Sequence, residues 1–270
     1  MGSGKGGPIL GLDHVTLVVD ELDAAVSTYE TLFAQPCTRR GAAEGLEWAW
    51  FALANTALVL VAPHGEPTSL AAHVASRSPG TRAALGALGL AVAELESATR
   101  LLERRGLPAA GPPLSWLGRL ATPLTPAGAR GLHLLLTRPS PAGSPAEITR
   151  LDHVVIRSGD PERATALLAG RLGLELRLDR SNPAWGSRLL FFRCGDLVVE
   201  VSHELAAGIT DALDSLWGLT WGVPDVAASH ARLEAAGVPV SPLRVGRKPG
   251  TRLFTIRDHA AGVPTAFIGE

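Results

Sequence analysis

The stretch that decides the fold is Leu12-Asp13-His14-Val15, which recurs in the second half of the chain as Leu151-Asp152-His153-Val154. Each copy opens a short apolar run, at 15–19 and at 154–156, and an acidic helix-start signal follows each run. The segments after these signals carry apolar residues at helical spacing. A tetrapeptide that returns with the same surroundings indicates an internal duplication.

A second pair of related segments, 87–95 and 218–226, lies deeper in each half. Both lead into an expected helix that ends on a similar phrase, Arg105-Gly-Leu-Pro108 in one half and Ala236-Gly-Val-Pro239 in the other, where the glycine suits a left-handed helix end. Runs rich in β-formers follow the expected helices, at 48–53, 57–61, 132–136, 188–193, 197–201, 251–257 and 265–268. The chain therefore reads as four units, each with one strand, one helix and about three more strands.

A βαβββ unit leaves an open sheet with one apolar face uncovered, so two units are expected to pair. The predicted fold class is α+β, with four βαβββ modules paired into two curved mixed-sheet cups. Proline and small polar residues fill 138–145, which is typical of a linker. We therefore predict a flexible N-terminal leader over 1–10, a first domain over 11–138, a linker over 139–149 and a second domain over 150–270.

Composition limits the classes of partner. The 270 residues carry a formal net charge of −1, which gives no reason to expect nucleic acid or an anionic membrane. No apolar run approaches the roughly 20 residues that span a bilayer, and the N-terminus lacks the apolar region of a signal peptide. The two cysteines, Cys37 and Cys194, match neither a disulfide framework nor a zinc spacing. We expect a cytoplasmic monomer or homodimer whose partner is a small molecule.

The repeated tetrapeptide carries a family resemblance. The Leu-Asp-His-Val strand, followed by an acidic residue and a helix of the Asp23-Ala24-Ala25 type, resembles the opening of modules in the vicinal oxygen chelate superfamily of glyoxalases, bleomycin-resistance proteins and extradiol dioxygenases. The second half also resembles glyoxalase-like proteins that end in a Gly-Arg-Lys-Pro-Gly-Thr-Arg segment, here 246–252. This resemblance implies a cup in which at least three protein ligands hold one divalent ion for a chelating substrate.

The ligand pattern implied by the resemblance is incomplete here. In the second domain His153 is present, but the matching positions fall on Gly218 and Ala266, which cannot bind a metal. In the first domain His14 is present, while its partner position is Ala87. We expect His14 to be a family relic that the backbone satisfies in the core, with His133 as the only polar candidate near it.

Glu200 offers a partial replacement, because it lies inside the apolar run 197–201 of the third module and a buried carboxylate needs a partner. We predict that His153 and Glu200 form a metal-free pair with a structural or acid–base role. The alternative is a divalent metal ion bound by His153 and Glu200 together with water or another histidine. The expected cofactor is therefore none or one divalent metal ion.

Two kinds of side chain are candidates for binding a substrate. Trp185 and Trp221 lie near strands of the second cup, where an indole can stack on a flat ligand. Five cations and no acid occupy 244–257, and Arg252 there, like Arg188, alternates with apolar residues. An arginine on a concave sheet grips a carboxylate or phosphate through two hydrogen bonds. The alternatives are core packing for the tryptophans and a solvated sheet edge for the arginines.

These observations favour a protein that binds a small aromatic or acidic metabolite in the C-terminal cup, with a degenerate metal site and metal-independent chemistry. We lean towards an enzyme, a lyase or a dioxygenase-like protein. One alternative is a metal-dependent extradiol-type dioxygenase or glyoxalase-like lyase. Another is a binding protein that sequesters a drug or metabolite without chemistry, since one superfamily fold supports both roles.

Overall fold

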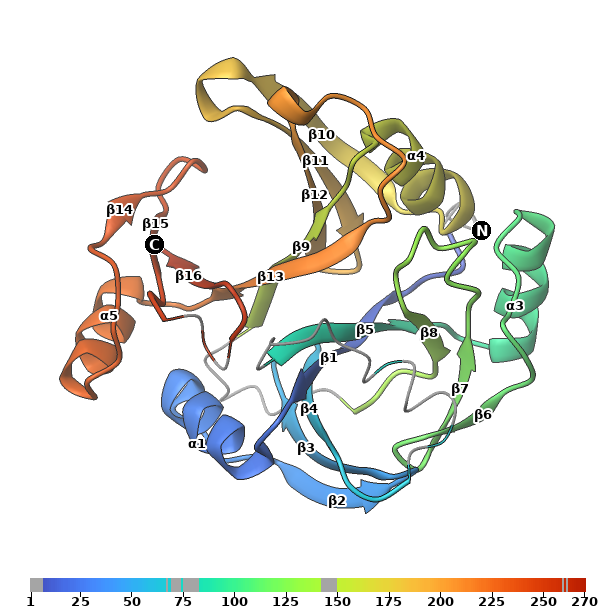
Figure 1. Ribbon diagram of the computed structural model, residues 1–270. Coiled ribbons are helices and arrows are strands. Elements are labelled where there is room, and N and C mark those ends of the chain that lie inside the picture. Colours follow the sequence, from blue (N-terminus) through green and yellow to red (C-terminus); the bar gives the residue numbers. More distant parts are fainter. Residues whose placement is uncertain are drawn as a thin grey trace, which may run out of the picture. The chain divides into compact units, whose positions relative to one another are not determined.

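The computed structural model describes residues 7–66, 68, 74, 83–141, 150–258, 260 and 262–270. Residues 1–6 of the expected leader and residues 142–149 of the expected linker lie outside these ranges. Two curved eight-stranded sheets organise the described residues (Figure 1). No helix among them is long and apolar enough to cross a membrane.

The first sheet contains the strands of the first two modules, in the order β2-β3-β4-β1-β5-β8-β7-β6. Their bounds are β1 (Gly11–Val19), β2 (Arg39–Ala43), β3 (Leu46–Ala52), β4 (Ala57–Pro63), β5 (Ala83–Ala91), β6 (Leu114–Trp116), β7 (Arg119–Pro123) and β8 (Leu134–Thr137). Strand β1 runs parallel to β4, and β5 runs parallel to β8. The two modules therefore meet along their first strands, β1 and β5.

The second sheet repeats this topology in the order β10-β11-β12-β9-β13-β16-β15-β14. Its strands are β9 (Arg150–Arg157), β10 (Glu175–Asn182), β11 (Ser187–Cys194), β12 (Leu197–Glu204), β13 (Ser215–Gly222), β14 (Arg244–Val245), β15 (Arg252–Thr255) and β16 (Thr265–Gly269). Strand β13 runs parallel to β16, as β5 does to β8. A position in one sheet can therefore be matched to a position in the other by its place in the ladder.

One helix follows the first strand of each module. These helices are α1 (Leu22–Phe33), α3 (Leu95–Arg104), α4 (Pro161–Thr165), which continues as a π-helix over Ala166–Arg171, and α5 (Val226–Ala235). Asp160 caps α4 by accepting hydrogen bonds from two backbone amides of its first turn, and Pro161 begins the helix as expected. Gly106 and Gly237 lie just beyond α3 and α5 with φ of 77° and 76°, which confirms the predicted glycine helix ends.

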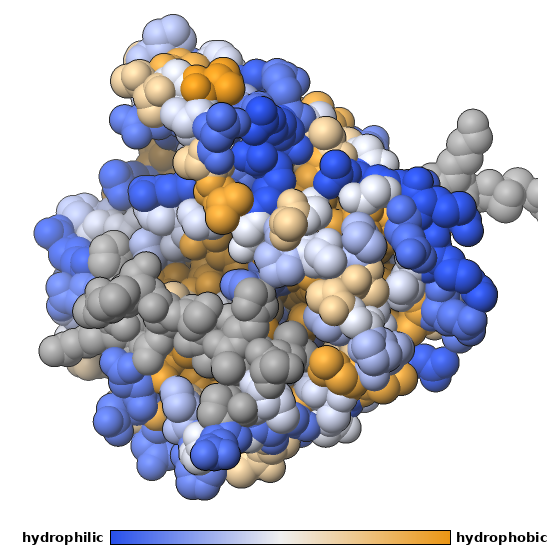
Figure 2. All heavy atoms as spheres, turned by 45° about the vertical axis from the view of Figure 1, so that its right-hand side comes forward, coloured by the Kyte–Doolittle hydropathy of each residue, from blue (hydrophilic) through white to orange (hydrophobic). Residues whose placement is uncertain are grey.

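The order strand, helix and three strands occurs four times, so the predicted fold class of four paired βαβββ modules is confirmed. Buried aliphatic and aromatic side chains lie on the strands of each sheet, and β1 is buried from Leu12 to Val19. On the face drawn in Figure 2 polar residues cover much of the described surface, and apolar residues reach it between them.

Contacts group the chain into two compact units that do not follow the order of the sequence. One unit comprises the described residues of 1–14, 87–140 and 155–216, and the other comprises those of 15–86, 141–154 and 217–270. The first copy of the tetrapeptide histidine, His14, falls in the former, and the second copy, His153, falls in the latter.

Candidate functional site

The first histidine of the repeat is sealed in the core. The side chain of His14 is fully buried, and its Nδ1 donates to Asp13 Oδ2 at 2.8 Å. Trp116 Nε1 donates to His14 Nε2 at 3.2 Å. An indole N–H is only a donor, so Nε2 accepts and the ring is neutral, with its proton on Nδ1. A Cβ at Gly89 would lie 2.2 Å from the ring, so the imidazole rests directly on the backbone of β5.

The carboxylate of Asp13 holds this arrangement together. It accepts from Arg119 Nη1 at 2.8 Å and from the backbone amide of Ser140, as well as from His14. Burial alone would raise the pKa of Asp13, but the hydrogen bonds from His14 and Arg119, together with the charge of Arg119, hold that pKa well below its usual value. The expectation that the backbone satisfies His14 is therefore corrected, because side chains engage both ring nitrogens.

The second histidine has the same carboxylate neighbour but a more open position. His153 Nδ1 lies 2.9 Å from Asp152 Oδ2, and the two side chains are 19% and 29% exposed. The hydrogen bond from His153 lowers the pKa of Asp152, burial opposes this, and the charges of Arg150 and Lys248 lower it further. An ionised carboxylate only accepts, so Asp152 keeps the proton of the neutral imidazole on Nδ1.

The strand register explains why one copy is sealed and the other is open. Trp116 pairs with Arg119 at the end of the β6–β7 ladder. In the second sheet Val245 pairs with Arg252, and the next pair outward joins the Gly246 amide to the Thr251 carbonyl at 2.7 Å. The two sheets can be aligned strand by strand, because β5 pairs with β8 and β8 with β7 in the first sheet, as β13 pairs with β16 and β16 with β15 in the second. This alignment matches Gly246 to Trp116 and Thr251 to Arg119. The second sheet thus has glycine in place of the indole and threonine in place of the guanidinium.

The 246–252 segment forms a longer turn than the corresponding β6–β7 turn of the first sheet, which its sequence alone did not reveal. The β6–β7 turn contains two residues, Leu117 and Gly118, both with positive φ, whereas four residues, 247–250, separate Gly246 from Thr251. A Cβ at Gly246 would lie 2.2 Å from Thr251 Oγ1, so only glycine fits there. The longer turn carries Lys248, whose charge acts on Asp152.

The residues that the structure describes do not fit the metal site that the superfamily implies. Among the described residues, no group of three or more histidine, cysteine, aspartate or glutamate side chains is arranged to hold a metal ion. At the first missing ligand position, a Cβ on Gly218 would lie 2.9 Å from the Pro264 carbonyl oxygen. At the second, Ala266 pairs with Thr220 and Thr255 and offers no donor atom beyond its backbone.

The structure divides the predicted site residues between the two units. Glu200, Arg188 and Trp185 lie in one, and His153, Trp221 and Arg252 lie in the other. Glu200 is half-buried on β12, opposite Phe191 of β11. The pairing of Glu200 with His153 stays a prediction.

The predicted binding residues have contrasting surroundings. Arg188 donates to both oxygens of Asp179 at 2.8 and 2.6 Å and to Glu162 of α4 at 2.7 Å, so two carboxylates already occupy its guanidinium. Trp221 is completely buried and packs edge-on against Phe33, with ring centroids 4.9 Å apart.

Trp185 and Arg252 are both more accessible than Trp221. Trp185 lies at the β10–β11 hairpin, in a short 3₁₀ turn (Pro183–Trp185), and Arg180 covers its ring at 4.8 Å. Arg252 is exposed on β15 and pairs with Gly269. Of the predicted binding residues, Arg252 therefore lies in the unit of His153 with its side chain open to solvent.

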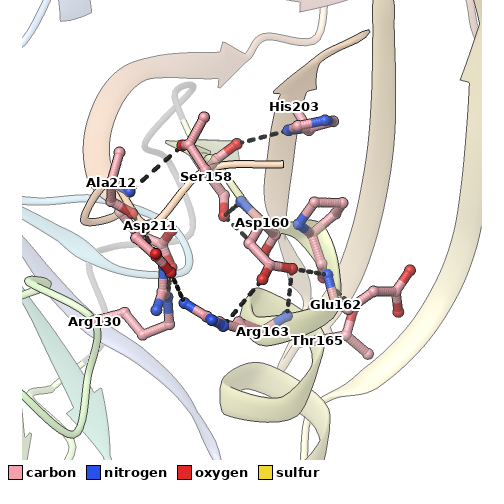
Figure 3. Close-up of polar contacts among 12 residues, drawn as sticks. Arg130, Ser158, Asp160, Glu162, Arg163, Thr165, His203, Asp211 and Ala212 are labelled. Atoms are coloured by element: carbon pink, nitrogen blue, oxygen red, sulfur yellow. Dashed lines mark hydrogen bonds and ion pairs between the residues drawn. The ribbon is translucent and has the colours of Figure 1, made fainter. Parts of the chain in front are cut away.

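A second polar cluster lies where α4 begins (Figure 3). His203 is buried and bonds the Ser158 carbonyl oxygen at 3.1 Å, while Ser158 Oγ contacts the backbone of Asp160. Arg163 joins Asp160 to Asp211, which lies in the loop between β12 and β13. These contacts cap a helix and fasten a loop, so the cluster is structural.

Sequence reasoning found His153 but missed the charged groups around it. Asp152, which contacts His153, and Arg150, which contacts Asp152, lie on the same strand, and the charge of Lys248 from the 246–252 turn acts on Asp152. The signal for Asp152 was present, because the repeated tetrapeptide keeps the aspartate as well as the histidine.

Comparison with known proteins agrees with the duplicated fold. A family model for the Glyoxalase/Bleomycin resistance protein/Dioxygenase superfamily matches residues 11–130, and a second model of the same superfamily matches residues 152–254. A comparison with curated protein sequences gave no significant match.

Similar solved structures include a mutant of 4-hydroxymandelate synthase from Streptomyces coelicolor, with a TM-score of 0.72, 13% identity, and coverage of 97% of this chain and 93% of that one. The Mn(II)-bound glyoxalase from Novosphingobium aromaticivorans has a TM-score of 0.67 and 12% identity, covering 98% of this chain and 83% of its own. BphC, a halotolerant catechol dioxygenase, has the same TM-score and identity, covering 97% of this chain and 87% of its own. These identities support the fold alone. With both halves matched by its models, the chain belongs to the glyoxalase, bleomycin-resistance protein and dioxygenase superfamily.

Proposed function

We propose that the second domain binds a small acidic metabolite beside the Asp152–His153 pair, and that His153 moves a proton there without a metal ion. The observation that carries this proposal is the contrast between two copies of one tetrapeptide. His14 is fully buried between Asp13 and Trp116, whereas His153 keeps the aspartate but has glycine at the register position of the indole. An imidazole that is oriented and partly open is suited to acid–base chemistry.

The role of Asp152 is to orient the imidazole. Because it accepts from Nδ1 at 2.9 Å, the carboxylate fixes one tautomer, and the lone pair of the ring then lies on Nε2. The ionised carboxylate also stabilises the imidazolium that forms when Nε2 takes a proton. His153 would therefore act as a base towards an acidic C–H or O–H group and return the proton in a later step.

The positive charge near this pair favours an anionic ligand. Arg150 lies 3.5 Å from Asp152, and the charge of Lys248 also acts on Asp152. Arg252 is exposed on β15 in the same unit. One carboxylate among several cations leaves a local excess of positive charge, which attracts an acidic molecule.

A ligand screen tests the binding part of this proposal. Thermal shifts would be measured with aromatic carboxylic acids, vicinal diols and neutral aromatic amides for wild type, His153→Gln and Arg252→Ala. His64→Gln serves as the control, because His64 is an exposed histidine of the first domain that pairs with Glu47. We expect acids to stabilise wild type and the control more than amides do. If no acid stabilises the wild-type protein, the proposal is wrong.

Proton transfer is tested with the most stabilising acid that carries a C–H next to its carboxylate, such as an arylacetic acid, because benzoic acids have no such hydrogen. Incubating this acid with the protein in D₂O should exchange the C–H next to its carboxylate or carbonyl group, as seen by NMR. His153→Gln should lose the exchange but keep the thermal shift. If wild type binds the acid but exchanges no C–H, the result would instead favour the alternative function, in which the protein sequesters its ligand without chemistry.

A second candidate function uses a metal ion, and the fold similarity to an Mn(II)-bound glyoxalase is the observation in its favour. It is tested by purifying the protein without chelators and measuring metal content. A stoichiometric ion that is lost in His153→Ala but kept in His64→Ala would replace our proposal with this one.

A further inference from the structure

Arg150 lies across the backbone of a neighbouring strand at a glycine. Gly222 is the last residue of β13, and a Cβ there would lie 2.9 Å from Nε and 3.0 Å from Cγ of Arg150. These distances are shorter than ordinary van der Waals contact, so the side chain of Arg150 fits only because residue 222 has none. Any larger residue would displace it.

The first domain has the opposite arrangement at the matching positions. The tetrapeptide repeat matches Arg150 to Gly11, and the strand ladders match Gly222, which pairs with Ile268, to Ala91, which pairs with Thr137. The second domain thus has a long cationic side chain where the first has none, and it lacks a Cβ on the adjacent strand where the first has one. The two differences act together, because each is needed for Arg150 to occupy its position.

The guanidinium of Arg150 keeps donors for another partner. Its Nη2 lies 3.5 Å from Asp152 Oδ1, which is at the outer limit of a hydrogen bond, and its side chain is 49% exposed. Asp152 is already bonded to His153 through its other oxygen. A guanidinium has five N–H donors in a planar fork, which matches the two oxygens of a carboxylate.

We infer that Arg150, seated on Gly222, is the residue that selects the ligand of the second domain by binding its carboxylate next to His153. This inference rests on the proposed function, and it names the ligand class as small carboxylic acids. Lys248 adds charge from the 246–252 turn, while Arg150 supplies the directed hydrogen bonds.

Calorimetric titration with benzoate, benzamide and inorganic phosphate tests the inference at low ionic strength. Arg150→Met removes the charge and keeps the aliphatic stem, so benzoate affinity should fall about tenfold while benzamide affinity stays unchanged. Gly222→Ala keeps the charge but displaces it, so benzoate affinity should also fall. Arg244→Met is the matched control, because Arg244 is an exposed cation on β14, and it should bind benzoate as wild type does.

Three results would overturn the inference: Arg150→Met binds benzoate as wild type does, wild type prefers benzamide, or phosphate binds more tightly than benzoate. Failure of the proposed function would give a different result from failure of this inference. If benzoate binding depends on Arg150 but no acid undergoes exchange that depends on His153, the carboxylate site stands and the proton-transfer role does not.

Discussion

Replacing each aspartate of the repeated tetrapeptide by asparagine compares the sealed and the open copy directly. The carboxylate of Asp13 is 1% exposed and accepts hydrogen bonds from His14, Arg119 and a backbone amide. An asparagine has one acceptor oxygen, and its amide group would face donors. Breaking a buried ion pair by removing one partner costs about 3–5 kcal/mol, so we expect Asp13→Asn to destabilise the protein by at least about 3 kcal/mol.

Asp152→Asn removes fewer and weaker interactions than Asp13→Asn does. Its carboxylate is 29% exposed, one hydrogen bond joins it to His153, and its contact to Arg150 spans 3.5 Å. Loss of one partly solvated interaction costs about 1 kcal/mol. For a chain of this size 1 kcal/mol corresponds to about 2–4 °C in melting temperature, so we expect drops of about 6–12 °C for Asp13→Asn and about 2–4 °C for Asp152→Asn.

Differential scanning calorimetry at neutral pH would measure both variants. Arg119→Met serves as a second probe of the sealed network, and combining it with Asp13→Asn should add little, because both remove the same ion pair. Equal drops for the two asparagine variants would refute the argument that the first copy is the structural one.

Three further predictions follow from the same contacts. The pKa of Asp13 is lowered in the folded protein, so the stability that Asp13 contributes is present above the pKa of an unfolded aspartate and is lost as pH falls. The melting temperature should therefore decline from about pH 5 to about pH 2, and it should decline less in Asp13→Asn. Gly89→Ala places a methyl group 2.2 Å from the ring of His14, so it should cost about 1–3 kcal/mol, measured by chemical denaturation, and a near-zero change would contradict the close packing. Replacing 246–251 by the residues of 116–119 transfers the indole and the guanidinium to the second domain, and it should slow modification of His153 by diethyl pyrocarbonate several-fold; an unchanged rate would contradict the register match.

The repeated fold was predictable because its signals are local. The tetrapeptide, the apolar spacing of the helices and the glycine helix ends each lie within a short window, and together they predicted four modules. Strands β2 and β10 were missed because edge strands need no apolar alternation: β10 is almost entirely exposed, and β2 reads Arg-Arg-Gly-Ala-Ala. The π-helix after α4 was missed because its apolar spacing resembles that of an α-helix.

The candidate site was only partly predictable. His153 follows from the repeat, but the difference between His153 and His14 depends on strand ladders. The corresponding turn has two residues in the first sheet and four in the second, which shifts the sequence spacing around Trp116 and Gly246. Their equivalence therefore appears only in the strand register. Burial of Trp221 and the ion pairs of Arg188 are likewise tertiary outcomes that no local pattern specifies.

The sealed position of His14 has a consequence for how damaging mutations should be distributed along the gene. A mutagenesis screen that scores soluble yield separately from ligand capture should find that changes around the first tetrapeptide reduce the amount of protein recovered. Changes around the second should leave yield intact and reduce capture. Such a result would mean that the two copies of one tetrapeptide serve different purposes, with His14 maintaining the fold and His153 serving the proposed ligand site.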